Sequence, residues 1–343
     1  MKRIKGLFDP IADYKNLASA AYLATRNCRR NREIVQFFDN LENELNAINQ
    51  DLHSERYRFG PYQSFQVRDT KTRTIHAPPF RDRVVHHAMI RVLGPIFEQT
   101  ASPNSYACRV NKGVHMALKK ARIATNQNPW YGKVDVERFY DSISHRLLYD
   151  RLARRFQEGK LLSLFRDLLA SYCTTPECGI PIGSLTSQYL GNFLLDSVDR
   201  TIRQSGIATN WIRYMDDTIV WGSHSVIHAM RDVIITELNN LGLKAKNGGE
   251  WNRCGQGVPC LGFVVYPGRV RLGKQARRRL RRRYRSARNQ FQRGEFDEFE
   301  FQDRITSLFA HAKHADDCSW RRAWLYSFSH RDIPTGDLYG DIQ

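Results

Sequence analysis

The chain lacks the cysteine pairs and long apolar runs that mark several protein classes. Its seven cysteines are odd in number and none forms a Cys-x-x-Cys pair, so a disulfide-stapled secreted domain is not indicated. The spacings Cys173/Cys178 and Cys254/Cys260 do not fit a zinc ribbon or finger. No apolar run approaches about 18 residues, and no signal peptide is recognisable. These absences predict reduced thiols, no membrane partner and a cytoplasmic location.

Acidic residues are scarce relative to basic ones. The chain has 35 Asp and Glu against 53 Lys and Arg, a net charge of +18. This excess predicts a polyanionic partner, most simply nucleic acid, because each neutralised phosphate releases counterions. A basic protein without such a partner is the alternative.

The charge is unevenly distributed. Residues 268–293 contain twelve Lys and Arg and no Asp or Glu. Leu280, Tyr284 and Phe291 interrupt this run, which favours a folded helical domain over a disordered tail. We expect one basic face of this domain to lie along a phosphate backbone.

Repeats and low-complexity linkers are also lacking, and 41% hydrophobic residues are enough for packed cores. Apolar periodicity predicts helices over about 16–52, 81–97, 144–156, 186–202 and 226–241, the second ending near Gly94-Pro95. Strands are expected within 57–79, over 130–136 and over 260–265. The order β–α–α–ββ–α–β from residue 130 onward indicates an α+β fold, a split βαβ antiparallel sheet with helices on one face.

Tyr214-Met215-Asp216-Asp217 lies between two apolar runs, 211–212 and 219–221. β-branched and aromatic flanks around a polar pair predict a β-hairpin with acids at its tip. Adjacent carboxylates repel each other unless a cation lies between them, and Mg²⁺ prefers such oxygen ligands. An acidic surface turn without a ligand is the alternative. Asp135 ends the strand predicted near 130–136, and the split βαβ arrangement would bring it beside the hairpin.

Four groups of residues occur in a specific order. They are Lys71-Thr72-Arg73 with Arg81-Asp82-Arg83, then Asp135 to Asp141, then Gly179 to Gln188, then Tyr214 to Asp217 followed by Leu261-Gly262-Phe263. Together they resemble the fingers and palm of a reverse transcriptase, over roughly residues 65–270. The basic helices that follow are similar to a thumb. The resemblance implies a right-hand polymerase fold, with an N-terminal helical extension over 1–56, fingers over 57–130, palm over 131–267 and thumb over 268–343.

Finer motifs indicate a subclass. Group II intron and retron reverse transcriptases usually have Ser-Pro where this chain has Ser187-Gln188. The segment Ile182 to Gln188 resembles the reverse transcriptases of diversity-generating retroelements, as do the segments 82–88 and 105–109. This resemblance implies copying of a specific template RNA with errors at template adenines. It also implies a small basic ring-forming accessory protein and a bacterial or phage source.

The resemblance assigns roles to individual residues. Asp135 and Asp216 would be the principal ligands of two Mg²⁺ ions, with Mn²⁺ as a substitute, and Asp217 and the Val136 carbonyl would assist. The nucleotide-binding residues would be Lys71, Arg73, Arg81, Tyr140, Gly183, Gln188 and Lys246. The template and primer would contact Ile182, Tyr214, Met215, Leu261, Gly262, Arg278 and Arg282.

Some assignments leave alternatives open. By this resemblance Tyr140 would lie under the sugar and exclude a 2′-hydroxyl, and the alternative is that Phe139 and Tyr140 are both core aromatics. Because neighbouring side chains on an extended segment face opposite ways, we favour Phe139 inside and Tyr140 at the sugar. Lys244 is an equal chemical candidate to Lys246 for assisting pyrophosphate. Two rival functions also stay open: a phage-defence reverse transcriptase that makes untemplated or protein-primed DNA, and a catalytically idle RNA-binding module of the same fold.

Overall fold

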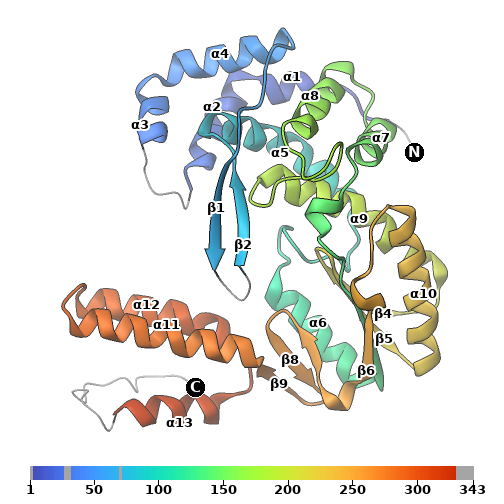
Figure 1. Ribbon diagram of the computed structural model, residues 1–343, viewed down its shortest axis with the longest axis vertical. Coiled ribbons are helices and arrows are strands. Elements are labelled where there is room, and N and C mark those ends of the chain that lie inside the picture. Colours follow the sequence, from blue (N-terminus) through green and yellow to red (C-terminus); the bar gives the residue numbers. More distant parts are fainter. Residues whose placement is uncertain (1–2, 27–31, 69–71, 330–343) are drawn as a thin grey trace. The chain divides into compact units, whose positions relative to one another are not determined.

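The computed structural model describes residues 3–26, 32–68 and 72–329 (Figure 1). The chain divides into two compact units. The first comprises Met1–Lys120 and Asn128–Asn252, and the second comprises Ala121–Gln127 and Arg253–Gln343. Within the described ranges, no helix is both long and apolar enough to cross a membrane. Helices and antiparallel strand pairs occur together, as in an α+β protein.

Short helices form the N-terminal part of the first unit. They are α1 (Phe8–Ala12), α2 (Tyr14–Ala24), α3 (Arg32–Asp39) and α4 (Leu41–His53). The region predicted to be helical over 16–52 is helical in its described parts and is divided among α2, α3 and α4. Asp13 caps α2 by accepting from the Asn16 amide at 3.0 Å, and Asn40 precedes α4. The helices α1, α2 and α3 pack on α5 (Phe80–Thr100), and α4 packs on α1, α2 and α3. Their buried apolar residues include Leu17, Ile48 and Val84.

The helix α5 runs through Pro95, so the predicted end near Gly94-Pro95 is also wrong. A proline inside a helix removes one hydrogen bond. Here α5 packs against α2 and α9 (Leu185–Ser205), and these contacts outweigh the local preference. Before α5, the strands β1 (Gln63–Arg68) and β2 (Thr72–Ala77) form a two-stranded antiparallel hairpin that extends away from the helices (Figure 1).

A four-stranded sheet in the order β4-β5-β3-β6 positions the candidate site. Its strands are β3 (Trp130–Val134), β4 (Asn210–Tyr214), β5 (Asp217–Gly222) and β6 (Glu250–Arg253). Helix α10 (His224–Asn240) packs on β3 and β5, and α9 packs on α10. The predicted hairpin is confirmed, because β4 and β5 pair in antiparallel register from Asn210–Trp221 to Tyr214–Asp217.

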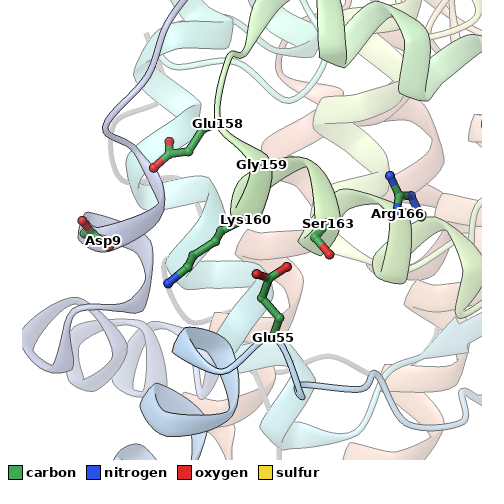
Figure 2. Close-up of a pocket in the computed structure, with 7 residues that line it drawn as sticks. All are labelled: Asp9, Glu55, Glu158, Gly159, Lys160, Ser163 and Arg166. Carbon is green, nitrogen blue, oxygen red and sulfur yellow. The ribbon is translucent and has the colours of Figure 1, made fainter.

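Between β3 and β4 the chain forms a 3-10 turn (Phe139–Ser142), α7 (His145–Arg155) and α8 (Gly159–Ala170). Ser144 caps α7 by accepting from the Leu147 amide, as expected. The start of α8 binds the N-terminal segment, because the Glu158 carboxylate accepts from the Leu7 and Phe8 amides at 2.8 and 3.1 Å. An open pocket of about 620 Å³ lies there. Figure 2 shows the residues that line it, Asp9, Glu55, Glu158, Gly159, Lys160, Ser163 and Arg166.

The second unit contains part of α6 (Val114–Gln127), a three-stranded sheet and the C-terminal helices. The sheet is formed by β7 (Val258–Cys260), β8 (Phe263–Tyr266) and β9 (Arg269–Leu272). The helices are α11 (Lys274–Gln292), α12 (Glu298–Ala312) and α13 (Cys318–Ser329), and α11 and α12 lie side by side (Figure 1). The predicted strand over 260–265 is interrupted, because Leu261 and Gly262 form a turn with φ of 49° and 87°.

Candidate active site

The strand register brings Asp135 and the hairpin acids together. β3 pairs with β5, and the last pair is Val134 with Thr218. Asp135 follows Val134, and Asp217 precedes Thr218, so the two acids continue from directly opposed positions on neighbouring strands. Asp216 lies one residue further along, in the two-residue loop of the β4–β5 hairpin. Sequence spacing alone could not give this convergence across 80 residues.

A second connection fixes the segment after β3. The Lys246 amide donates to the Asp135 carbonyl at 2.8 Å, and the Glu137 amide donates to the Lys244 carbonyl at 2.8 Å. These two bonds flank Val136, which lies opposite Ala245 in an antiparallel bridge. The Val136 carbonyl does not accept either of these two hydrogen bonds. Lys246 Nζ lies 3.9 Å from Asp135 Oδ2, whereas Lys244 Nζ lies 3.9 Å from Glu137 and is 84% exposed. Of the two lysines, the structure places Lys246 at the aspartate.

The hairpin acids are largely buried and repel one another. Burial raises the pKa of Asp216 to about 6, and the nearby charges of Asp135 and Asp217 contribute to the rise. Burial also raises the pKa of Asp217, although the Lys133 ammonium opposes this shift. Each of these carboxylates is thus less stable as an anion than in water, and a cation placed among them would relieve the repulsion.

Lys133 is a residue that the sequence reasoning missed. Its Nζ lies 2.8 Å from Asp217 Oδ2. The other oxygen, Oδ1, is buried and has no hydrogen-bond partner within the described part of the chain. No group of three or more His, Cys, Asp or Glu side chains among the described residues is gathered closely enough to hold a metal ion. The donor chemistry nevertheless fits a hard divalent cation, since carboxylate oxygens are its preferred ligands and one of them is unsatisfied.

Two aromatic residues follow Asp135 in a 3-10 turn rather than on the expected extended segment, and their ring centroids are 5.2 Å apart. Phe139 is 3% exposed, and its ring lies 3.1 Å from where a Cβ on Gly191 of α9 would be. Tyr140 is half-buried, and its pKa is raised mainly by burial and also by Cys108 and Asp216, while Arg73 opposes the shift. Arg73 on β2 also acts on Asp216. The structure therefore brings Tyr140 and Arg73 into the electrostatic surroundings of the carboxylates; their roles toward a nucleotide stay predictions.

The segment Ile182 to Gln188 packs against β2. The Ile182 carbonyl accepts from the His76 amide at 2.7 Å. Gly183 has φ of 114°, and a Cβ there would lie 2.6 Å from Ile75 Cγ2. A glycine is therefore required by the close approach of β2, and the predicted approach of Gly183 to a nucleotide stays a prediction. Gln188 lies in the first turn of α9 and is half-buried.

A buried histidine supports the same segment. Ser184 precedes α9 without forming a side-chain cap, because its Oγ bonds instead to His86 Nδ1 at 3.0 Å and to Thr186 Oγ1 at 2.9 Å. His86 is 1% exposed, and burial lowers its pKa to about 3. This network was not predicted, because it joins residues about 100 positions apart.

Of the other predicted site residues, Arg81 has partners elsewhere in the first unit, and the rest lie in the second unit or outside the described residues. Arg81 forms ion pairs with Asp51 at 2.8 Å and Glu44 at 3.8 Å on α4, which does not support its predicted role on a triphosphate. Lys71 lies outside the described residues. Leu261 and Gly262 form the β7–β8 turn of the second unit, and Arg278 and Arg282 are exposed one turn apart on α11.

An arginine and an aspartate beneath the hairpin were also missed. Arg213 on β4 and Asp199 on α9 are each 1% exposed. Arg213 Nε and Nη2 donate to the two carboxylate oxygens of Asp199, both at 2.7 Å. Arg213 Nη1 donates to the Met215 carbonyl in the loop at 3.0 Å. A charged residue inside an apolar strand was the available signal, but its partner could not be identified from sequence.

Comparison with known proteins identifies the family. Residues 66–248, more than half of the chain, match the family described as "Reverse transcriptase (RNA-dependent DNA polymerase)". The chain belongs to this reverse transcriptase family. The matched region contains the three carboxylates, Tyr140, Arg73 and Lys246.

Individual relatives are distant. Protein YkfC of Escherichia coli (strain K12) is 24% identical over 200 residues, which are 54% of this chain and 52% of that protein. Group II intron-encoded protein LtrA of Lactococcus lactis subsp. cremoris is 24% identical over 172 residues, 48% of this chain and 29% of that protein. Nuclear intron maturase 2, mitochondrial, of Arabidopsis thaliana is 24% identical over 151 residues, 39% and 20% respectively. The chain thus spans about half or less of the length of these relatives.

Proposed function

We propose that the chain is an RNA-directed DNA polymerase that copies a template RNA into cDNA. The observation that carries the proposal is the β3–β5 register, which places Asp135 beside Asp217 and next to Asp216 at the hairpin tip. Membership of the reverse transcriptase family supports the same activity. The raised pKa of Asp216 supports a cation at this place, because a cation would stabilise the ionised carboxylate.

The residues around the carboxylates suit nucleotidyl transfer. Asp135 and Asp216, assisted by Asp217 and the Val136 carbonyl, would hold two Mg²⁺ ions, for which Mn²⁺ substitutes. When bound, such ions activate a primer 3′-hydroxyl and stabilise the leaving pyrophosphate. The three carboxylates would stay ionised and direct their oxygens toward the metal-binding site.

Neighbouring side chains would bind the nucleotide. The Arg73 guanidinium offers two parallel donors to a triphosphate, and Lys71 would add a point charge. Tyr140 would pack under the sugar and exclude a 2′-hydroxyl. Lys246, 3.9 Å from Asp135, would donate a proton to pyrophosphate and is favoured over Lys244 by this placement.

The remaining assignments concern template and primer. Gly183 and Gln188 would approach the incoming nucleotide, and Ile182, Tyr214 and Met215 would contact the base pair beside them. Leu261, Gly262, Arg278 and Arg282 would contact the primer–template duplex. In this proposal residues 1–56 are an N-terminal extension, 57–130 the fingers, 131–267 the palm and 268–343 the thumb.

We further propose that the enzyme belongs to a diversity-generating retroelement. The segment Ile182 to Gln188, with Gln at the second position of the Ser187-Gln188 pair, supports this subclass. In that case the polymerase makes errors at template adenines and works with a small basic ring-forming protein in a bacterial or phage-infected cytoplasm.

Primer extension tests the polymerase proposal. A heteropolymeric RNA template with an annealed DNA primer, Mg²⁺ and four dNTPs would be offered to the wild-type chain, to Asp216→Asn and to Asp232→Asn. Asp232 is an exposed aspartate on α10 and serves as the matched control. We expect Mg²⁺-dependent cDNA from the wild type and from Asp232→Asn, and a loss of at least about 1,000-fold in Asp216→Asn. Extension that survives Asp216→Asn would contradict the site.

Sequencing of the cDNA tests the subclass. Errors concentrated at template adenines would support the retroelement proposal, whereas accurate cDNA would remove it and leave the polymerase. DNA made without a template would favour the phage-defence alternative. RNA binding without extension, in the presence of native RNA and candidate accessory protein, would favour the idle binding module.

A further inference from the structure

The loop that carries Asp216 is held from inside the protein by one arginine. Arg213 Nη1 donates to the Met215 carbonyl at 3.0 Å and to Asn192 Oδ1 on α9 at 2.9 Å. Asn192 in turn donates to the Ala107 carbonyl at 2.9 Å. The backbone of Arg213 is fixed as well, because its amide donates to the Asn104 carbonyl and its carbonyl accepts from the Tyr106 amide. The arginine therefore joins β4, α9 and the 104–107 segment to the loop.

Asp199 determines the direction of this guanidinium. Both Asp199 oxygens accept from Arg213, at 2.7 Å each, and both residues are 1% exposed. A planar guanidinium held by two parallel bonds cannot rotate without breaking both. With Nε and Nη2 fixed in this way, Nη1 is aimed at the Met215 carbonyl.

The loop needs such support because its first residue is in an uncommon conformation. Met215 has φ of 56°, a left-handed value that non-glycine residues avoid. Its side chain is 8% exposed, and a Cβ on Gly191 would lie 3.7 Å from its Sδ. Packing beneath the side chain and the Arg213 bond to the carbonyl therefore act on the same residue, directly before Asp216.

We propose that Arg213, oriented by Asp199, is a positioning residue that sets the Met215–Asp216 loop and thereby the direction of the Asp216 carboxylate. Arg213 is buried and does not touch substrate in this account. The inference rests on the proposed function for its kinetic consequence, whereas its structural consequence can be measured without any activity.

Replacing the whole ion pair separates positioning from stability. Arg213→Met with Asp199→Leu removes both charges together, and such apolar replacements of buried ion pairs often preserve stability. The matched control is Arg151→Met with Glu237→Leu, which removes an ion pair between α7 and α10, with 3.9 Å between the charged atoms, that does not contact the loop. A third variant, Arg213→Lys, keeps a positive charge near Asp199 but loses the planar fork.

The first readout is hydrogen exchange of the full chain without substrate. In the Arg213→Met/Asp199→Leu variant we expect exchange at residues 214–217 to become at least about tenfold faster, while α8 and the β7–β9 sheet exchange as in the wild type. The control pair should leave 214–217 unchanged. Equal exchange of 214–217 in the pair variant and the wild type would overturn the inference, whether or not the wild type polymerises DNA.

The second readout is primer extension under saturating dNTP. We expect kcat to fall about 10- to 100-fold in the pair variant, because a small displacement of a reacting group has effects of this size. The KM for dNTP should stay within about threefold, because Arg73 and Tyr140 are unchanged. Arg213→Lys should lose a similar factor in kcat. A wild-type kcat in Arg213→Lys would contradict the proposal that the planar guanidinium of Arg213 orients the loop. Absence of primer extension by the wild type itself would refute the proposed function instead.

Discussion

Lys133 Nζ lies 2.8 Å from Asp217 Oδ2, and this contact makes the three carboxylates of the site unequal. Lys133 is paired with Ile219 across β3 and β5, so Asp217 is its diagonal neighbour on the sheet. The lysine neutralises part of the charge on Asp217, whereas Lys246 lies 3.9 Å from Asp135. We therefore expect Asp135 and Asp216 to be the stronger cation ligands, with Asp217 contributing through Oδ1, for which the described residues provide no hydrogen-bond partner.

Lys133→Gln should shift the acid limb of the pH–activity profile. Lys133 opposes the upward shift of the Asp217 pKa, so its loss lets the acids retain protons to higher pH. We expect the acid limb of kcat/KM in primer extension to move to higher pH, with a smaller effect on kcat/KM at pH 8.5. Lys133→Arg should retain the wild-type limb. An unchanged limb in Lys133→Gln would show that the lysine does not tune the carboxylates.

Asp216→Asn should stabilise the metal-free protein while it removes activity. The folded-state pKa of Asp216 is about 6, above the usual 3.8, so the folded state binds more protons than the unfolded state between these values. Stability is therefore lost as pH rises through 6, and Asn avoids this loss. We expect the free energy of unfolding in EDTA to rise by about 1–3 kcal/mol at pH 8 and to change little through this effect at pH 4. Lower stability of the variant at pH 8 in urea unfolding would contradict the electrostatic account.

His86→Asn should flatten the dependence of stability on pH. The folded-state pKa of His86 is about 3, against 6.5 for an ordinary histidine, so the unfolded state binds the extra proton between these values. Stability is lost as pH falls below 6.5, by at most about 1.4 kcal/mol per pH unit from this residue. Urea unfolding at pH 8, 6, 5 and 4.5 would measure the slope. His224→Asn, at an exposed position, is the control and should keep the wild-type slope.

Tyr140→Ala should allow ribonucleotides to be incorporated. The ring is half-buried near Asp216 and Arg73, where it would meet a 2′-hydroxyl. We expect the ratio of kcat/KM for dNTP over NTP to fall about 10- to 100-fold, because the discrimination depends on steric exclusion. Tyr140→Phe keeps the ring and should keep the ratio. If Tyr140→Ala leaves this ratio unchanged, a residue other than Tyr140 excludes the 2′-hydroxyl.

Local sequence signals predicted the hairpin well. The β-branched and aromatic residues on both sides of Asp216 define β4 and β5, and Ser144 marks the start of α7. The same local signals gave wrong element boundaries where contacts with other elements determine the backbone conformation. The α5 helix continues through Pro95 because α2 and α9 support it, and the strand expected over 260–265 breaks where Leu261 adopts a positive φ.

Long-range partners could not be predicted. The fourth strand of the sheet, Glu250–Arg253, has a single large apolar side chain, Trp251, and gives a weak strand signal. Lys133 and Arg213 are charged residues inside strands, and only the folded chain shows that they contact Asp217 and Asp199. The carboxylates themselves were found because their motif and its order along the chain are specific.

Single-nucleotide incorporation shows whether Asp135 and Asp216 are needed for template-directed nucleotide addition. A DNA primer on an RNA template would receive one labelled dNTP in the presence of Mg²⁺, with the wild type, Asp135→Asn and Asp216→Asn compared side by side. We expect template-directed addition by the wild type, dependence of this addition on Mg²⁺, and loss of addition in both variants with their folding retained. Addition that continues in either variant, or that ignores the template base, would contradict this expectation.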